Sequence, residues 1–248
     1  SAPLLLNGLR CVGAFLLLLV PSAAMGMTLP LLLRAFGAPE RRFGSALGLL
    51  YGVNTLGAVA GVMATELVLL ATLGVRGSSF VAGGLNVLAV IAALRLLQSD
   101  ESAAPSAEPA VRLPWNGLRL LTAAFLSGFA LLALEVVWLR VLMLFLNDSP
   151  LAFAIVLAIV LTGIAAGGLL ASAWLGRIES ADRYVPMVAY GAGMLGVGGF
   201  LLYPSYLQRY LMADQTALSI LEVATPLVLP TSLASGALFA LLGAALRR

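Results

Sequence analysis

Long apolar runs alternate with short polar turns along this sequence, and the apolar runs predict helices. Crossing the roughly 30 Å apolar layer of a bilayer takes about 20 residues of α-helix. Seven runs approach or exceed that length, at residues 9–34, 43–73, 78–97, 118–146, 150–175, 185–202 and 217–246. The sixth run can be extended to residue 211. We therefore expect an all-α integral membrane protein with about seven transmembrane helices.

One connecting stretch, residues 98–114, is much longer and more polar than the others. It is rich in Ser, Pro and acidic residues, a composition that cannot bury an apolar core. It divides the chain into a three-helix part, residues 1–97, and a four-helix part, residues 115–248. We interpret the stretch as a cytoplasmic linker.

The composition supports a lipid environment and restricts the chemistry of the chain. Hydrophobic residues make up 61% of the 248 residues and charged residues only 10%, whereas a soluble domain carries about 25% charged residues. The chain has no His and a single Cys, Cys11. The usual ligands of haem and zinc are therefore missing, and no internal disulfide can form. We expect no cofactor, no metal site and no nucleic-acid partner.

The arginines predict an orientation in the membrane. All fourteen basic residues are Arg. When successive turns are assigned to alternate sides, Arg10, Arg76, Arg140 and Arg209 fall on one side and the other ten fall opposite. Because basic residues are retained on the cytoplasmic side, we expect the N-terminus outside and the C-terminus inside, in a bacterial cytoplasmic membrane. This assignment requires an odd number of crossings.

Glycines at a spacing of four residues predict close helix packing. Small residues at this spacing let two helix backbones approach each other in lipid. The spacing occurs at Gly44, Gly48 and Gly52, at Gly57 and Gly61, and at Gly163 and Gly167. Packing within one bundle and packing between two copies of the chain both remain open.

Two distant segments align without a gap. Residues 20–30 read VPSAAMGMTLP and residues 229–239 read LPTSLASGALF. Each has an apolar residue, a Pro, a hydroxyl residue and then mostly small residues. The match indicates two related halves, which is a common transporter architecture.

Four segments also carry a resemblance to a known group of proteins. They are residues 21–32 (PSAAMGMTLPLL), residues 48–58 (GLLYGVNTLGA), residues 127–140 (SGFALLALEVVWLR), and residues 152–157 (AFAIVL) with 163–167 (GIAAG). Together they resemble the membrane domain of bacterial fused major-facilitator/spermidine-synthase-like proteins.

The resemblance implies a partial major-facilitator-like arrangement. Residues 1–97 would correspond to the end of the first half and residues 115–248 to the start of the second half. Members of this family usually carry a cytoplasmic aminopropyltransferase-like domain, and no segment of this chain resembles it. We therefore expect a part of a longer protein, with no catalytic site among these residues.

Four ionisable residues fall inside the predicted spans. They are Glu66, Glu135, Arg140 and Glu222. A charge at the centre of a membrane helix costs roughly 2.5–3.5 kcal/mol on insertion scales, so such residues usually have a partner or a function. They either neutralise neighbouring helices or form an outward-facing acidic pocket for a cation such as a polyamine. Proton coupling through Glu135 is a further alternative.

Prolines and one amide complete the candidate residues. Pro21 and Pro30 in the first run, and Pro226 and Pro230 in the last, remove backbone donors at matching places. They predict helix breaks that line a site, or kinks without a ligand. Asn54 either binds a substrate or hydrogen-bonds to a neighbouring helix.

The sequence leaves three functions open. The first is a membrane module that binds or transports a cationic small molecule. The second is an accessory subunit that packs among other membrane subunits. The third is the membrane part of an enzyme whose catalytic domain lies outside these residues.

Overall fold

The computed structural model describes residues 2–35, 43–99, 115–143, 150–177, 183–211 and 216–246. Nearly all of these residues are helical, and no strand occurs among them. The helices are α1 (Ala2–Ala35), α2 (Phe43–Ala64), the π-helical turn η2 (Thr65–Leu69), α3 (Leu70–Ser99), α4 (Trp115–Met143), α5 (Pro150–Leu175), α6 (Val185–Leu211) and α7 (Ala217–Leu246).

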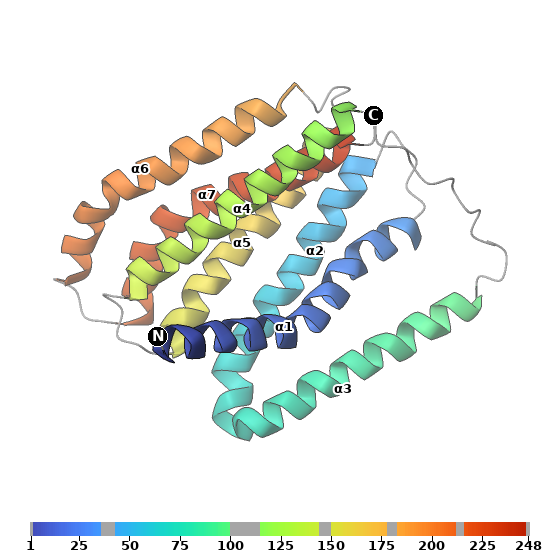
Figure 1. Cartoon of the computed structure of the whole chain (residues 1–248), viewed down its shortest axis with the longest axis horizontal. Coiled ribbons are helices and arrows are strands. Elements are labelled where there is room, and N and C mark those ends of the chain that lie inside the picture. The colour runs from blue at the N-terminus through green and yellow to red at the C-terminus, as the bar shows by residue number, and fades with distance from the viewer. Residues whose placement is uncertain are drawn as a thin grey trace.

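The predicted fold class is confirmed. Within the described ranges, six helices are long and apolar enough to cross a membrane. One of them, Phe43–Arg95, runs for 53 residues, which at 1.5 Å per residue is about 80 Å if straight. It is interrupted at Gly74, whose φ of 63° and ψ of −175° are non-helical. Figure 1 shows the chain turning back at this point, so α2 and α3 provide two membrane-spanning lengths.

The helix ends differ from the predictions in detail. Helix α1 begins at Ala2 instead of residue 9, and α6 reaches Leu211, the longer of its two predicted limits. The predicted turn at residues 74–77 contracts to the single residue Gly74, because a positive φ is available to glycine without steric cost. Most of the predicted linker, and the predicted end of the fourth helix, lie outside the described residues.

Helix α5 forms the centre of the bundle, with its most extensive contacts to α7 and α2. Figure 1 shows α4, α5, α6 and α7 running side by side. The close approach is possible because glycines face backbone. A Cβ placed on Gly48 would lie 2.6 Å from the Gly168 carbonyl oxygen, and one on Gly167 would overlap the Leu233 carbonyl oxygen.

The glycine prediction is confirmed for Gly44, Gly48 and Gly52 of α2, and it stays a prediction for Gly57 and Gly61. Gly44, Gly48 and Gly52 are buried against α5 and α7. A Cβ on Gly57 or Gly61 would meet nothing within 4 Å among the described residues. The spacing of four therefore marks a helix face that can be approached, and a partner helix is still needed to fill it.

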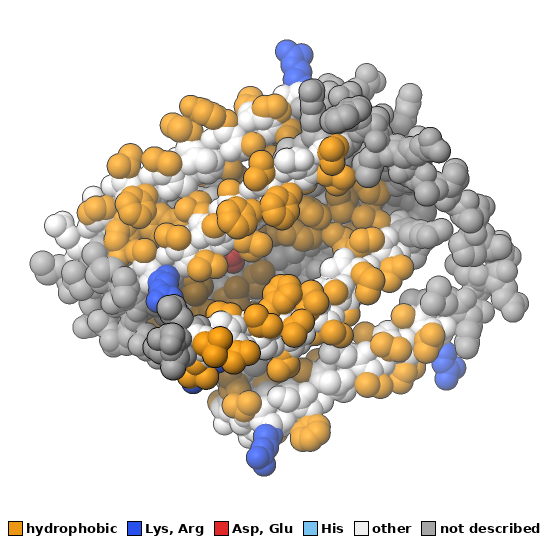
Figure 2. All heavy atoms as spheres, in the orientation of Figure 1, with side chains coloured by type: hydrophobic (Ala, Val, Ile, Leu, Met, Phe, Trp, Pro, Cys, Tyr) orange, Lys and Arg blue, Asp and Glu red, His pale blue; other side chains and the backbone are white. Residues whose placement is uncertain are grey.

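Helices α1 and α3 lie at the margin of the bundle. Side chains 5–33 of α1 are exposed, apart from the half-buried Leu29 and Leu33. Helix α3 makes its main contacts with η2. Figure 2 shows that apolar side chains cover much of the visible face, with the basic side chains mostly towards its edges. Such a face is stable in a bilayer, because lipid tails are as apolar as these side chains.

Candidate functional site

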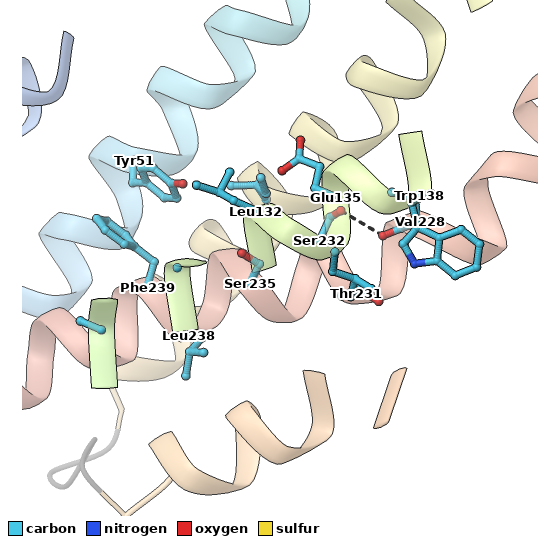
Figure 3. Close-up of a pocket in the computed structure, with 14 residues that line it drawn as sticks. Tyr51, Leu132, Glu135, Trp138, Val228, Thr231, Ser232, Ser235, Leu238 and Phe239 are labelled. Carbon is cyan, nitrogen blue, oxygen red and sulfur yellow. Dashed lines mark hydrogen bonds between the residues drawn. The ribbon is translucent and has the colours of Figure 1, made fainter. Parts of the chain in front are cut away.

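A cavity of about 220 Å³ lies between α4 and α7. Helix α7 contributes Val228, Thr231, Ser232, Ser235, Leu238 and Phe239. These positions recur every three or four residues, so they share one face of the helix. Helix α4 contributes a second such face, while Tyr51 of α2 and Ile164 of α5 complete the lining. Figure 3 shows residues from three of these helices around the cavity.

Small side chains on α4 keep this space open. Ala124 and Gly128 line the cavity, and a Cβ added to Gly128 would meet nothing within 4 Å. Farther along the same face, Leu134 and Trp138 fill the gap between α4 and its neighbours. The α4 side of the cavity therefore combines these two small residues with the larger side chains of Leu132, Leu134, Glu135 and Trp138.

Glu135 is the acidic residue in the lining of the cavity. It lies in the middle part of the apolar span Ala124–Leu142 and is half-buried. No hydrogen bond or ion pair joins its carboxylate to another described residue. A carboxylate at this depth is costly without a partner. The cavity is therefore a place where a cationic group would relieve an existing electrostatic cost.

Hydroxyl groups accompany the carboxylate in the lining. Ser232 donates a hydrogen bond of 2.9 Å from its Oγ to the Val228 carbonyl oxygen, which leaves the lone pairs of its hydroxyl oxygen unused. The buried Thr231 Oγ1 has no hydrogen-bond partner among the described residues. Tyr51 and Ser235 present two further hydroxyls. The lining therefore offers several hydroxyl acceptors beside one carboxyl group.

Aromatic contacts hold two of the lining residues in place. The ring of Tyr51 packs against Phe239, with 4.3 Å between the ring centroids. Trp138 is 2% exposed. Its ring lies 5.9 Å from that of Phe200 and 5.8 Å from that of Tyr203. The walls at the two ends of the cavity are thus fixed by packing between helices.

Trp138 also contains a polar atom without a partner. Its indole Nε1 is buried and forms no hydrogen bond within the described part of the chain. Figure 3 shows the nitrogen-bearing edge of the indole turned towards Thr231 of α7. Buried donors of this kind are usually paired, so this end of the cavity is polar as well as aromatic.

The other charged candidates do not line the cavity. Glu66 is half-buried in η2, while Glu222 and Arg140 are exposed. Arg140 follows Glu135 by five residues on α4, a spacing that turns the two side chains to different faces. No ion pair between them occurs in the described structure. The structure therefore assembles one carboxylate at the cavity, where the sequence suggested several charges.

Asn54 and the four prolines also lie apart from the lining. Asn54 is exposed on α2, and Pro21 and Pro30 are exposed on α1. Pro226 and Pro230 are half-buried in α7; Pro226 precedes the segment that lines the cavity, and Pro230 lies within that segment without lining it. Helices α1 and α7 continue through all four prolines, so the helix breaks are not found here and kinks without a ligand stay as the alternative. Each proline removes one backbone donor, and the hydrogen bonds of the neighbouring turns maintain the helix.

Several residues that line the cavity were not among the candidate site residues predicted from the sequence. Trp138 is most simply an interfacial anchor or packing residue when only its position in the chain is considered. Thr231, Ser232 and Ser235 belong to the repeated segment 229–239, which was a usable signal. The matching segment of α1 lies on an exposed helix, so only one copy of the repeat contributes to the cavity.

Within the described residues there is no group of three or more Cys, Asp or Glu side chains that could hold a metal ion. Comparisons of the chain with protein-family models, with curated proteins and with solved structures gave no match.

Proposed function

We propose that this chain is a membrane module that binds a cationic small molecule at Glu135. The observation that supports the proposal is a carboxylate without a described partner, in the lining of a cavity of about 220 Å³ inside a membrane-spanning bundle. Opposite charge is the most direct way to offset the cost of such a carboxylate. Hydroxyl groups from α2 and α7 accept the remaining hydrogen bonds of the cation.

The position of the cavity supports a role in substrate handling or transport. Tyr51 belongs to the three-helix part of the chain, and the other lining residues belong to the four-helix part. Transporters built from related halves bind their substrates near the midplane, at the interface between the halves. The resemblance to the membrane domain of spermidine-synthase-like fusions makes a polyamine one candidate ligand.

The size of the cavity suits a small ligand. An engineered cavity of about 150 Å³ accommodates benzene, whereas drug-sized ligands occupy roughly 300–1,000 Å³. A cavity of about 220 Å³ therefore suits a short amine, or one end of a longer one.

Binding of 1-aminohexane and spermidine to the purified full-length protein in lipid nanodiscs tests the proposal. Glu135→Gln keeps the shape of the side chain and removes its charge. We expect about tenfold weaker binding or more, because a hydrogen bond to a charged group contributes about 1.5–3 kcal/mol. Glu222→Gln is the matched control, since Glu222 is exposed and remote from the cavity lining. Equal binding by the Glu135→Gln variant and the unchanged protein would reject the site.

We also propose the orientation that the arginines indicate, with the N-terminus outside and the C-terminus in the cytoplasm of a bacterial cell. Figure 1 shows the two ends of the chain at opposite ends of the bundle, which supports an odd number of crossings. Epitope tags at the two ends, probed in intact and in permeabilised cells, test it. We expect only the N-terminal tag to be accessible in intact cells; equal accessibility of both tags would contradict the orientation.

A second candidate function is that of an accessory subunit in a larger membrane complex. The observation that favours it is the loose packing of α1 and α3, together with the open face at Gly57 and Gly61. Such a subunit would co-purify with other membrane proteins in a fixed ratio when extracted in a mild detergent. A chain that remains a monodisperse single species under these conditions would argue against this function.

A further inference from the structure

We infer that the cavity prefers a cation with one ammonium group and an apolar body over a polyamine. This inference rests on the proposed cation site and narrows the class of its ligand. It follows from how many charges the described structure brings together at the cavity and from what surrounds them.

Charge balance in the cavity favours a single ammonium group. Of the three glutamates in the described structure, only Glu135 lines the cavity. One ammonium group satisfies this carboxylate. A second or third ammonium group in the cavity would lose its water without gaining an opposite charge, which is strongly unfavourable. A diamine or spermidine therefore has to leave charged groups outside or to bind weakly.

The polar groups around Glu135 match one ammonium group, which has three N–H donors. The Glu135 carboxylate accepts at least one of them. The hydroxyls of Tyr51 and Ser235 also line the cavity, and neither forms a hydrogen bond within the described residues. Figure 3 shows these two residues and Glu135 arranged around the cavity, on three different helices. The polar part of the lining thus accommodates a single cationic group.

Most of the remaining lining is apolar, apart from the hydroxyls of Thr231 and Ser232 and the indole Nε1 of Trp138. Leu132, Leu134, Ile164, Val228 and Leu238 line the cavity, together with the ring of Phe239. Burial of apolar surface against such side chains contributes about 25 cal/mol per Å². The body of the ligand therefore contributes to affinity when it is uncharged and apolar.

The way into the cavity also favours a ligand with an apolar body. Figure 2 shows an acidic side chain in a hollow of an otherwise apolar face, between the positions of α4 and α2 in Figure 1. Leu132, which lines the cavity, is 64% exposed. A hollow that opens through an apolar face is accessible from the bilayer. An amine with an apolar body partitions into the bilayer, whereas a polyamine stays in water.

The experiment compares three amines on the full-length protein in nanodiscs: 1-aminohexane, 1,6-diaminohexane and spermidine. The first two have the same carbon chain and differ by one ammonium group. Binding to Glu135→Gln nanodiscs is subtracted to remove partition into lipid, and 1-hexanol serves as the uncharged control. We expect the binding that depends on Glu135 to be about tenfold tighter for 1-aminohexane than for 1,6-diaminohexane.

The possible outcomes separate the two proposals. Equal or tighter binding of 1,6-diaminohexane or spermidine, still dependent on Glu135, would overturn this inference and leave the cation site intact. Binding of all three amines without any dependence on Glu135 would reject the cation site itself.

A gain of specificity provides a test that does not depend on removing Glu135. Leu132→Glu adds a second carboxylate at the exposed edge of the cavity, and Leu132→Gln is its uncharged control. We expect Leu132→Glu to shift the preference at least about tenfold towards 1,6-diaminohexane, and Leu132→Gln to leave it unchanged. An unchanged preference in both variants would count against charge balance as the basis of selectivity.

Discussion

Helices α5 and α1 are both apolar enough to cross a membrane, yet they have opposite surroundings. Half of the residues in the apolar stretch of α5 are buried inside the protein, and none of those in α1 are. The hydrophobicity of each helix therefore predicts that it is removed from water. It does not say whether protein or lipid takes the place of water, because both are apolar.

Small residues explain part of the difference. Helix α5 presents Gly163 and Gly167 to the backbone of α7 around Leu233. Helix α1 also has glycines, at Gly13 and Gly26, but a Cβ on either would meet nothing within 4 Å. Glycine permits close approach, and the stabilisation comes from the van der Waals contacts that the partner supplies.

Helix α4 has one face buried against protein and another face exposed at the surface of the protein. Trp138 is 2% exposed and packs against α6, whereas Phe125 is 71% exposed on another face. If the buried and exposed faces of the helices differ as the structure indicates, matched substitutions of one buried and one exposed residue should have unequal effects on stability.

The largest effect is expected for Trp138→Ala. Removal of the buried indole leaves a cavity against Phe200 and Tyr203, and we expect the free energy of unfolding to fall by about 3 kcal/mol. Titration of the folded protein with sodium dodecyl sulfate in mixed micelles measures this change. Phe125→Ala on the same helix should change the free energy of unfolding by less than about 0.5 kcal/mol. Equal losses in the two variants would mean that Phe125 packs against another helix, in addition to its ring contact with Phe129 on α4.

Smaller changes in the free energy of unfolding, of opposite sign, are expected when two glycines are replaced by alanine. Gly167→Ala places a methyl group against the Leu233 carbonyl oxygen and should lower the free energy of unfolding by about 2 kcal/mol. Gly61→Ala adds the same methyl group in open space, and should raise it by up to about 1 kcal/mol, because Ala favours the helix more than Gly does. The same titration measures both, and a loss at Gly61 would show that its face is packed.

The smallest effect is expected for a polar contact between helices. Ser172 donates a hydrogen bond of 2.6 Å from its Oγ to the Ser45 carbonyl oxygen, which joins α5 to α2. Ser172→Ala should cost about 0.6 kcal/mol, the average for such contacts in a membrane protein. Ser79→Ala is the control, because Ser79 bonds the Val75 carbonyl oxygen within α3. A loss at Ser79 equal to that at Ser172 would show that α3 is not a marginal helix.

The candidate site could be predicted from the sequence only in part. Glu135 is recognisable because an acidic residue in an apolar run is costly wherever the helix packs. Glu66 and Glu222 fit the same criterion, but they lie away from the cavity. Tyr51 carries no such signal, since a hydroxyl in a membrane helix is common, and Ser235 is marked only by the repeated segment 229–239. Their contribution depends on how α2 and α7 are rotated towards α4.

The sequence by itself determined that lipid replaces water around most of the chain. It also determined the helical fold class, the approximate spans and the presence of a turn near Gly74. These properties depend on local composition and chain length, which set how many residues cross a layer of known thickness. The tertiary structure alone decided that Gly48 is packed while Gly61 is open, and that Glu135 faces a cavity with Tyr51 and Ser235. The reason is physical: in a bilayer the face of a helix towards lipid and its face towards protein are equally apolar, so the pattern of hydrophobic positions cannot tell them apart.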